Sequence, residues 1–307
     1  MFKGVCEEIN IMGKYIVVKQ EGSGVNIEFD NKLDDYCPNK NNGINGQCET
    51  NDEKISAGFI WLLVMFEHLC DEECPQNEKD RYVEYAILWL SYMLNQISNE
   101  GISTLKNFYT NHIENNTNYT SHVSSASDSN YKGIVDKKIN LMNMNKNIIS
   151  KFYEVLKSLC SMHTECIGCK SNCTDCLEKA KDFADKYNKL NENSDTNQSD
   201  SYKNVLYSLS TDYNNLKNYL IENCTDCNDT SSFPEIKAPQ GSFQIFEATS
   251  PISSIASILI PVLLTFSITF FLGIAYKYSL FGFDKRLNRQ YLREKIKKIK
   301  KKMNRYI

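Results

Sequence analysis

The chain has 307 residues, of which 41% are hydrophobic, so it can build one large or two small domains with a buried core. The formal net charge of −3 hides an asymmetry, because residues 277–307 hold 12 Lys and Arg against two acids. Residues 1–276 therefore carry −13, which gives no reason to expect a nucleic-acid partner for the bulk of the chain.

The first 53 residues are predicted to be loop-rich. The opening "MFKGVCEEINIMGKYIVVKQ" has no apolar core of the length that a cleaved signal peptide needs. Strand-like alternation is confined to "KYIVVKQ". The stretch "CPNKNNGINGQC" has Gly, Asn and Pro between Cys37 and Cys48, which predicts a turn closed by a local disulfide.

A helical hairpin is predicted next. "NDEKISAGFIWLLVMFEHLC" offers an Asn or Asp cap at its start and then a dense apolar run, and "NEKDRYVEYAILWLSYMLNQIS" follows with helical spacing. Cys70, Cys74 and Pro75 lie at the turn between them. The uncharged parts of both runs are shorter than the roughly 18 residues of a membrane span, so we interpret them as core.

Helical patterning returns in three later segments. These are "KKINLMNMNKNIISKFYEVLKSLC", "DCLEKAKDFADKYNKL" and "YKNVLYSLSTDYNNLKNYLIENC". Polar stretches near residues 114–131 and 191–201 separate the helices and are predicted to be exposed loops. Residues 1–227 are therefore predicted to form a mainly α, Cys-rich domain, and residues 228–254, with three prolines, an extended stalk.

One transmembrane helix is predicted over residues 255–276, which carry no charge. As a helix these 22 residues reach roughly 33 Å, which matches a hydrocarbon core of about 30 Å. The positive bias of residues 277–307 predicts a short basic cytosolic tail, with the N-terminal domain on the other side. The alternatives are a buried helix of a soluble protein, and a tail-anchored chain whose bulk faces the cytosol.

The tail itself has an amphipathic pattern. Leu292, Ile296, Ile299 and Met303 recur at steps of four, three and four, among basic residues that could lie on an anionic leaflet. A plain stop-transfer anchor explains the same pattern. The candidate membrane-surface residues are Lys295, Lys297, Lys298, Lys300, Lys301 and Lys302.

Twelve cysteines precede the predicted membrane helix and none follows it, as expected of a disulfide framework on an outer face. The segment "ECIGCKSNCTDC" could also suggest zinc, an iron–sulfur cluster or a redox pair, but its spacing fits none of those motifs well. The candidates for structural disulfides are Cys6, Cys37, Cys48, Cys70, Cys74, Cys160, Cys166, Cys169, Cys173, Cys176, Cys224 and Cys227.

No catalytic motif accompanies these cysteines. The four histidines lack motif context, and G-x-S-x-G, P-loop and H-E-x-x-H patterns are missing from the sequence. We therefore expect no enzymatic activity, no cofactor, no metal and no small-molecule substrate. Sequons such as the one at Asn118 are treated as hypotheses about exposure only.

Several segments together resemble a known family. "LDDYCP", "CETNDEKISAGFIWLLVMFEHLC", "YVEYAILWLSYMLNQ" and above all "AYKYSLFGFDKRLNRQYLREKIKKIKKKMNRYI" are similar to the Plasmodium interspersed repeat (PIR) variant antigens of the rodent-malaria branch, over nearly the full chain. The resemblance implies a variant antigen displayed on or near the infected red cell, with roles in immune evasion and host–parasite interaction. It also implies that a missing N-terminal signal is usual and that N-glycans on the sequons are doubtful.

The sequence thus predicts a mainly α, disulfide-stapled ectodomain held by one membrane helix in the infected red cell or parasite-surrounding membranes. Its expected partners are the lipid bilayer and an unidentified host cell-surface protein. Two other functions stay open: a host-receptor adhesin with a defined ligand, and an intracellular membrane organiser that acts through the basic tail.

Overall fold

The computed structural model describes residues 2–22, 24–38, 47–70, 74–97, 104–123, 131–166, 173–192, 199–224, 233–237 and 239. The chain divides into two compact units, residues 1–242 and 243–307. The predicted membrane helix (255–276), the tail (277–307) and the six candidate lysines lie outside the described residues. Within the ranges given above, no helix combines the length and the hydropathy that crossing a membrane demands.

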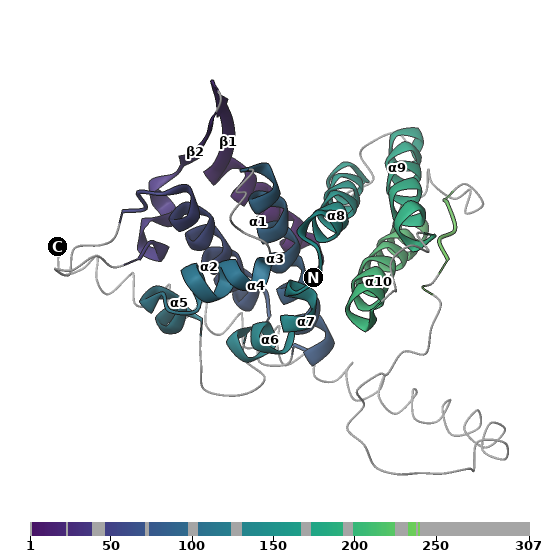
Figure 1. The fold of residues 1–307 in the computed structure, drawn as a ribbon. Coiled ribbons are helices and arrows are strands. Elements are labelled where there is room, and N and C mark those ends of the chain that lie inside the picture. Colours follow the sequence, from purple (N-terminus) through teal and green to yellow (C-terminus); the bar gives the residue numbers. More distant parts are fainter. Residues whose placement is uncertain are drawn as a thin grey trace, which may run out of the picture. The chain divides into compact units, whose positions relative to one another are not determined.

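The first unit is mainly helical, as predicted (Figure 1). In chain order its elements are α1 (Phe2–Tyr15), β1 (Ile16–Glu21), β2 (Gly24–Phe29), the 3-10 helix η1 (Asn31–Tyr36), α2 (Asn51–Leu69), α3 (Gln76–Gln96), α4 (Leu105–Phe108), the π-helix η2 (Tyr109–Ile113), α5 (Thr117–His122), α6 (Tyr131–Lys137), α7 (Ile139–Met142), α8 (Lys146–Cys166), α9 (Cys173–Asn191) and α10 (Asp200–Asn223).

Helix α8 is the centre of the unit. It packs against α1 and α3 on one side and against α9 and α10 on the other (Figure 1). Its buried residues include Ile149, Phe152, Leu156 and Leu159, at the steps of three and four that bring side chains to one helix face. The helical patterning predicted for this segment is thus confirmed over α8.

The predicted α2–α3 hairpin is confirmed, and its turn carries the Cys70–Cys74 disulfide. The cap of α2 differs from the prediction. The Thr50 side chain accepts from the Glu53 backbone N–H, and the Glu53 carboxylate accepts from the Thr50 N–H, so the cap is Thr50 and Asn51 is the first residue of the helix.

The loop-rich prediction for residues 1–53 is wrong over much of its length. Helix α1 buries Val5, Cys6, Ile9 and Met12, a helical spacing on one face, and packs against α2 and α8. Strands β1 and β2 then form an antiparallel hairpin, in which Gly22 at the turn has the positive φ of 62° that favours glycine. The strand expected within "KYIVVKQ" is confirmed as β1.

The predicted loop over residues 114–131 is also partly wrong, because it contains helix α5. Tyr119 of this helix is fully buried, and the Asn118 side chain donates to the carbonyl of Cys37. Most residues of this stretch are polar, but contacts with residues far away in the sequence bury part of it. The Asn118 sequon is therefore inaccessible in the folded chain.

Residues 233–237, which the sequence-based prediction assigns to the stalk, contact the helical domain. Phe233 is 3% exposed, the Tyr213 hydroxyl donates to the Pro234 carbonyl at 2.7 Å, and Lys217 pairs with Glu235. The Lys237 carbonyl accepts from Tyr187 of α9 at 3.2 Å. The helical domain therefore extends past the predicted boundary at residue 227, because one aromatic ring and exposed carbonyls find partners on α9 and α10.

Replacing Gly58 by alanine should destabilise the fold by about 1–2 kcal/mol, although alanine favours helix by about 1 kcal/mol. A Cβ there would lie 2.6 Å from Cη2 of Trp89 and 2.5 Å from Cδ1 of Ile16, and the indole cannot easily move. Urea unfolding followed by circular dichroism measures the change. Gly13→Ala in α1 is the control, since nothing lies within 4 Å of its Cβ, and it should stabilise slightly. Equal effects at both positions would contradict this packing.

Candidate functional site

Four disulfides join described residues of the first unit. Cys6–Cys160 links α1 to α8 and spans 154 residues of sequence, whereas Cys37–Cys48 and Cys70–Cys74 close short loops. Cys166–Cys176 connects the last residue of α8 to the first turn of α9. The structure thus pairs eight of the twelve candidate cysteines with one another.

The cysteine cluster of "ECIGCKSNCTDC" sits at a helix–helix corner. Cys166 and Cys176, two of the four cysteines in this cluster, form a disulfide, so neither sulfur is a thiolate that could bind a metal ion. Among the described residues, no group of three or more His, Cys, Asp or Glu side chains could hold a metal ion. Cys224 is also disulfide-bonded, and the side chains of Cys169, Cys173 and Cys227 lie outside the described part of the chain.

A buried ionic network joins α3 to α10, and sequence patterning missed it. The Tyr85 hydroxyl donates to Oδ2 of Asp212 at 2.5 Å, and Nη1 of Arg81 lies 3.3 Å from Oδ1 of the same carboxylate. Burial raises the pKa of Asp212, while the positive charge of Arg81 opposes that rise. The one signal in the sequence was an acid within the apolar face of α10, between Leu209 and Leu216.

A second buried network joins α3, α10 and the α6–α7 junction. Glu84 is 3% exposed, and its carboxylate accepts from Nζ of Lys138 and from Oγ of Ser208, both at 2.7 Å. Both charges in this network are paired, so the network fixes the orientation of α10 on α3.

His163 is the one buried histidine among the described residues. It is 5% exposed, and the Phe2 ring packs edge-on against it with centroids 5.9 Å apart. Burial lowers the pKa of His163 to about 4, and the nearby Glu7 charge only partly offsets this. The side chain is therefore neutral in the folded protein at neutral pH.

This histidine predicts a pH-dependent stability. Between pH 6.5 and 4 the unfolded chain binds a proton at His163 and the folded chain does not, so the free energy of unfolding falls as the pH falls. The free energy of unfolding falls by up to about 3 kcal/mol in total by pH 4. Denaturant titrations across this range should show that His163→Asn removes the corresponding slope. His68→Asn, at an exposed position of α2, should leave it in place. Identical slopes for both variants and the parent would refute the assignment.

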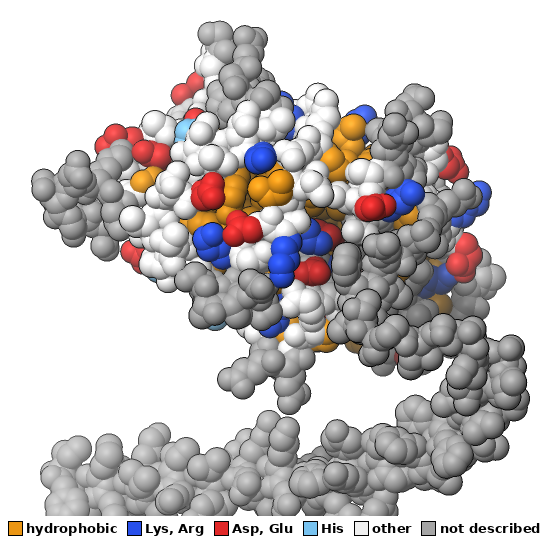
Figure 2. Space-filling model, turned by 60° about the horizontal axis from the view of Figure 1, so that its bottom comes forward, with side chains coloured by type: hydrophobic (Ala, Val, Ile, Leu, Met, Phe, Trp, Pro, Cys, Tyr) orange, Lys and Arg blue, Asp and Glu red, His pale blue; other side chains and the backbone are white. Residues whose placement is uncertain are grey.

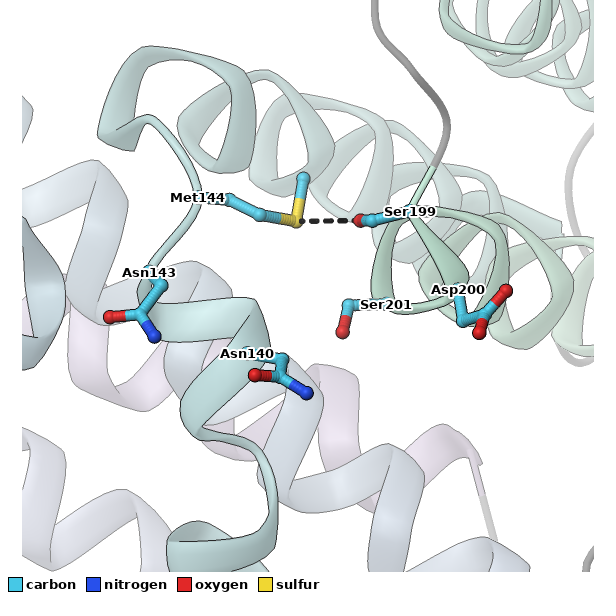
Figure 3. Close-up of a pocket in the computed structure, with 6 residues that line it drawn as sticks. All are labelled: Asn140, Asn143, Met144, Ser199, Asp200 and Ser201. Carbon is cyan, nitrogen blue, oxygen red and sulfur yellow. Dashed lines mark hydrogen bonds between the residues drawn. The ribbon is translucent and has the colours of Figure 1, made fainter.

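A shallow hollow lies between the α7 end and the start of α10 (Figure 3). Five of its six lining residues are polar, and Oγ of Ser199 contacts Sδ of Met144 at 3.8 Å. Its functional groups are the Ser199 and Ser201 hydroxyls, the Asp200 carboxylate and two side-chain amides. The lining residues are Asn140, Asn143, Met144, Ser199, Asp200 and Ser201.

The surface is mixed in character. On the face shown in Figure 2, hydrophobic side chains gather in small areas bordered by acidic and basic side chains. The large hydrophobic side chains that are exposed in the described part of the chain are Val17 of β1 and Tyr207 and Tyr219 of α10. In the described residues, disulfides and buried ion pairs join the helices, and few large hydrophobic side chains reach the surface.

Comparison with known proteins agrees with this picture. No curated protein matches the chain. A solved structure described as a Plasmodium PIR protein ectodomain is 53% identical, with a TM-score of 0.59, and the match covers 79% of this chain and 100% of that chain. The family model for Plasmodium variant antigen protein Cir/Yir/Bir matches residues 6–277. The rodent-malaria branch stays a prediction. On the length of these matches, the chain belongs to the Cir/Yir/Bir (PIR) family of Plasmodium variant antigens.

Proposed function

We propose that this chain is a membrane-anchored variant surface antigen of a malaria parasite, with its helical ectodomain outside and its C-terminus in the cytosol. It acts in immune evasion and host–parasite interaction, at the infected red cell or at the membranes that surround the parasite. Membership of the variant antigen family supports this role. On the host side, we propose an unidentified cell-surface protein as partner.

The observation that carries the proposal is the disulfide framework. Cys6 and Cys160 are both buried, and their bond connects the first helix to the central one. Such bonds form and persist in oxidising compartments and are rare in the cytosol. The framework therefore supports a placement of residues 1–242 outside the cytosol.

The architecture also suits antigenic variation. Helix α9 ends at Asn191 and α10 begins at Asp200, so the connection between them starts and ends at fixed points of a cross-linked core. Changes in the length of such a surface connection cost little loop-closure entropy. Sequence can then vary there without loss of the fold.

Removing the predicted anchor tests the proposal. A chain truncated after residue 254 should leave the membrane pellet and appear in the soluble fraction, whereas the full chain should resist carbonate extraction. The reason is that residues 255–276 offer the uncharged length of one span. Fractionation with immunoblotting measures the distribution.

A charge variant of the full chain is the control. Lys297, Lys298, Lys300 and Lys301 changed together to Gln should leave it in the pellet, since a span does not need the basic tail for anchoring. Release by these substitutions would favour the membrane organiser instead. Retention of the truncated chain in the pellet would refute the predicted anchor.

A further inference from the structure

A short segment that follows α10 in the chain lies across α9 and α10, and we call its residues 233–237 the strap (Figure 1). Its first residue, Phe233, is 3% exposed and belongs to the hydrophobic core of the unit. Ile236 packs against the same core, and Pro239, just beyond the strap, is buried. The strap is thus held on the helices without a helix or strand of its own.

Polar side chains of both helices bind carbonyl oxygens of the strap. On α10, the Tyr213 hydroxyl donates to the Pro234 carbonyl at 2.7 Å. On α9, the Tyr187 hydroxyl and the Asn191 amide both donate to the Lys237 carbonyl, at 3.2 and 3.0 Å. One end of the strap is therefore fixed to α10 and the other end to α9.

One ion pair adds to these contacts. The Lys217 ammonium pairs with the Glu235 carboxylate, and the Lys217 side chain is 10% exposed whereas the Glu235 side chain is 85% exposed. Because most of the Glu235 side chain lies in water, salt screens this pair and its contribution is small. The strap therefore depends mainly on the buried Phe233 ring and on the three hydrogen bonds.

Helix α10 is itself held more firmly than the strap. Its Asp212 carboxylate pairs with Arg81 and accepts from the Tyr85 hydroxyl, and its Ser208 hydroxyl donates to Glu84, so buried polar contacts join it to α3. Stability within a protein is uneven, and a segment with few buried apolar contacts opens before the elements on which it lies. The strap can therefore detach while α9 and α10 stay folded.

The strap lies between the helices and the predicted anchor along the chain. Residues 240–254 connect it to the predicted membrane helix at residues 255–276. A pull on that anchor is therefore borne first by the contacts of the strap with α9 and α10. The bonds to the Lys237 carbonyl are loaded before those to Pro234, so the contacts break one after another.

We propose that the strap is a force-released latch, which lengthens the tether between the helical domain and the membrane without unfolding the helices. The proposal rests on the membrane anchoring proposed above, which supplies the pull. While the strap is bound, the free tether starts at residue 240, and after release it starts at residue 225, beyond the Cys224 cap of α10. The 15 residues gained have an extended length of at most about 50 Å.

Optical-tweezers pulling on residues 1–242 tests the latch. These residues have their own core and match a relative solved as an ectodomain. A handle is attached at each end, and the N-terminal one pulls on α1, which the Cys6–Cys160 disulfide links to α8. The expected record shows a small reversible extension, of at most about 50 Å, at a lower force than the unfolding of the helices. Unfolding without this earlier extension would overturn the proposal.

Two tyrosine variants assign the early extension to the strap. Tyr213→Phe removes one hydrogen bond to the strap and should speed its release up to about fivefold at a given force. Tyr202→Phe is the matched control, because its hydroxyl donates to the Leu190 carbonyl of α9, also at 2.7 Å, and not to the strap. It should leave the release rate unchanged. Equal release rates for the two variants would overturn the proposal.

Salt dependence gives a second readout. Raising the ionic strength should speed release in the parent and leave release in Glu235→Gln unchanged, because screening weakens the pair with Lys217. The Glu235 side chain is 85% exposed, so the variant should keep the parent melting temperature. The same salt dependence in both proteins would show that the early extension is not release of the strap. The measurement on residues 1–242 involves no membrane, so its failure leaves the proposed anchoring untouched.

Discussion

Replacing Cys6 and Cys160 together by alanine should lower the free energy of unfolding by about 5 kcal/mol. Their disulfide closes a sequence separation of 154 residues, so its loss gives the unfolded chain much more conformational freedom. It also frees α1 from the central helix α8. Guanidinium unfolding under non-reducing conditions, followed by circular dichroism, measures the change while the other disulfides stay intact.

The Cys37–Cys48 disulfide provides the matched control. Its separation is only 11 residues, so the double alanine variant should lose about 3 kcal/mol by the same entropy argument. Cys6, Cys160 and Cys37 are buried and Cys48 is half-buried, so the side-chain truncations are of similar kind. Equal losses of unfolding free energy for the two double variants would contradict the structural role assigned to the disulfide between α1 and α8.

Asp212→Ala should destabilise the fold by about 3–5 kcal/mol, because it removes the buried carboxylate of the pair and leaves Arg81 with only Glu78, at 3.6 Å. The substitution removes the carboxylate that pairs with Arg81 and accepts from the Tyr85 hydroxyl. Asp212 is 5% exposed, so water cannot replace it. The same unfolding measurement applies.

Two further variants distinguish the loss of the buried ion pair from the effect of replacing any aspartate by alanine. Asp182→Ala breaks an exposed pair with Lys186, at 2.7 Å on α9, and should change stability by less than about 0.5 kcal/mol. Arg81→Met combined with Asp212→Leu should be less destabilised than Asp212→Ala alone, since the buried carboxylate and its guanidinium are removed together and apolar side chains fill their place. Equal losses for Asp212→Ala and Asp182→Ala would contradict the network.

The long amphipathic helices could be predicted from the sequence because their periodicity is local. In α10, Val205, Leu209, Leu216 and Leu220 recur at helical spacing, and all four are buried. The prediction was wrong for segments that are buried by residues far away in the sequence. The sequence of helix α5 is typical of a polar loop. In the structure, the Asn118 side chain donates to the carbonyl of Cys37, 81 residues earlier in the chain.

The same distinction holds for the candidate site. Cysteine count and position predicted a disulfide framework, but no local feature indicates that Cys6 pairs with Cys160. The pairing follows only once α1 packs on α8. The break between α7 and α8 was missed for a different reason, since Asn145 caps the following turn by accepting from the Asn147 N–H, which a search for apolar period does not detect.

Brief protease treatment of intact infected red cells, followed by non-reducing mass spectrometry, tests most directly whether an oxidised ectodomain is displayed on the outer side of a membrane. We expect external protease to remove peptides from residues 1–242, with the peptide that contains Cys6 still linked to the one that contains Cys160, while residues 277–307 stay protected. Protection of residues 1–242 on the same side as the basic tail, with Cys6 and Cys160 recovered as free thiols, would contradict it.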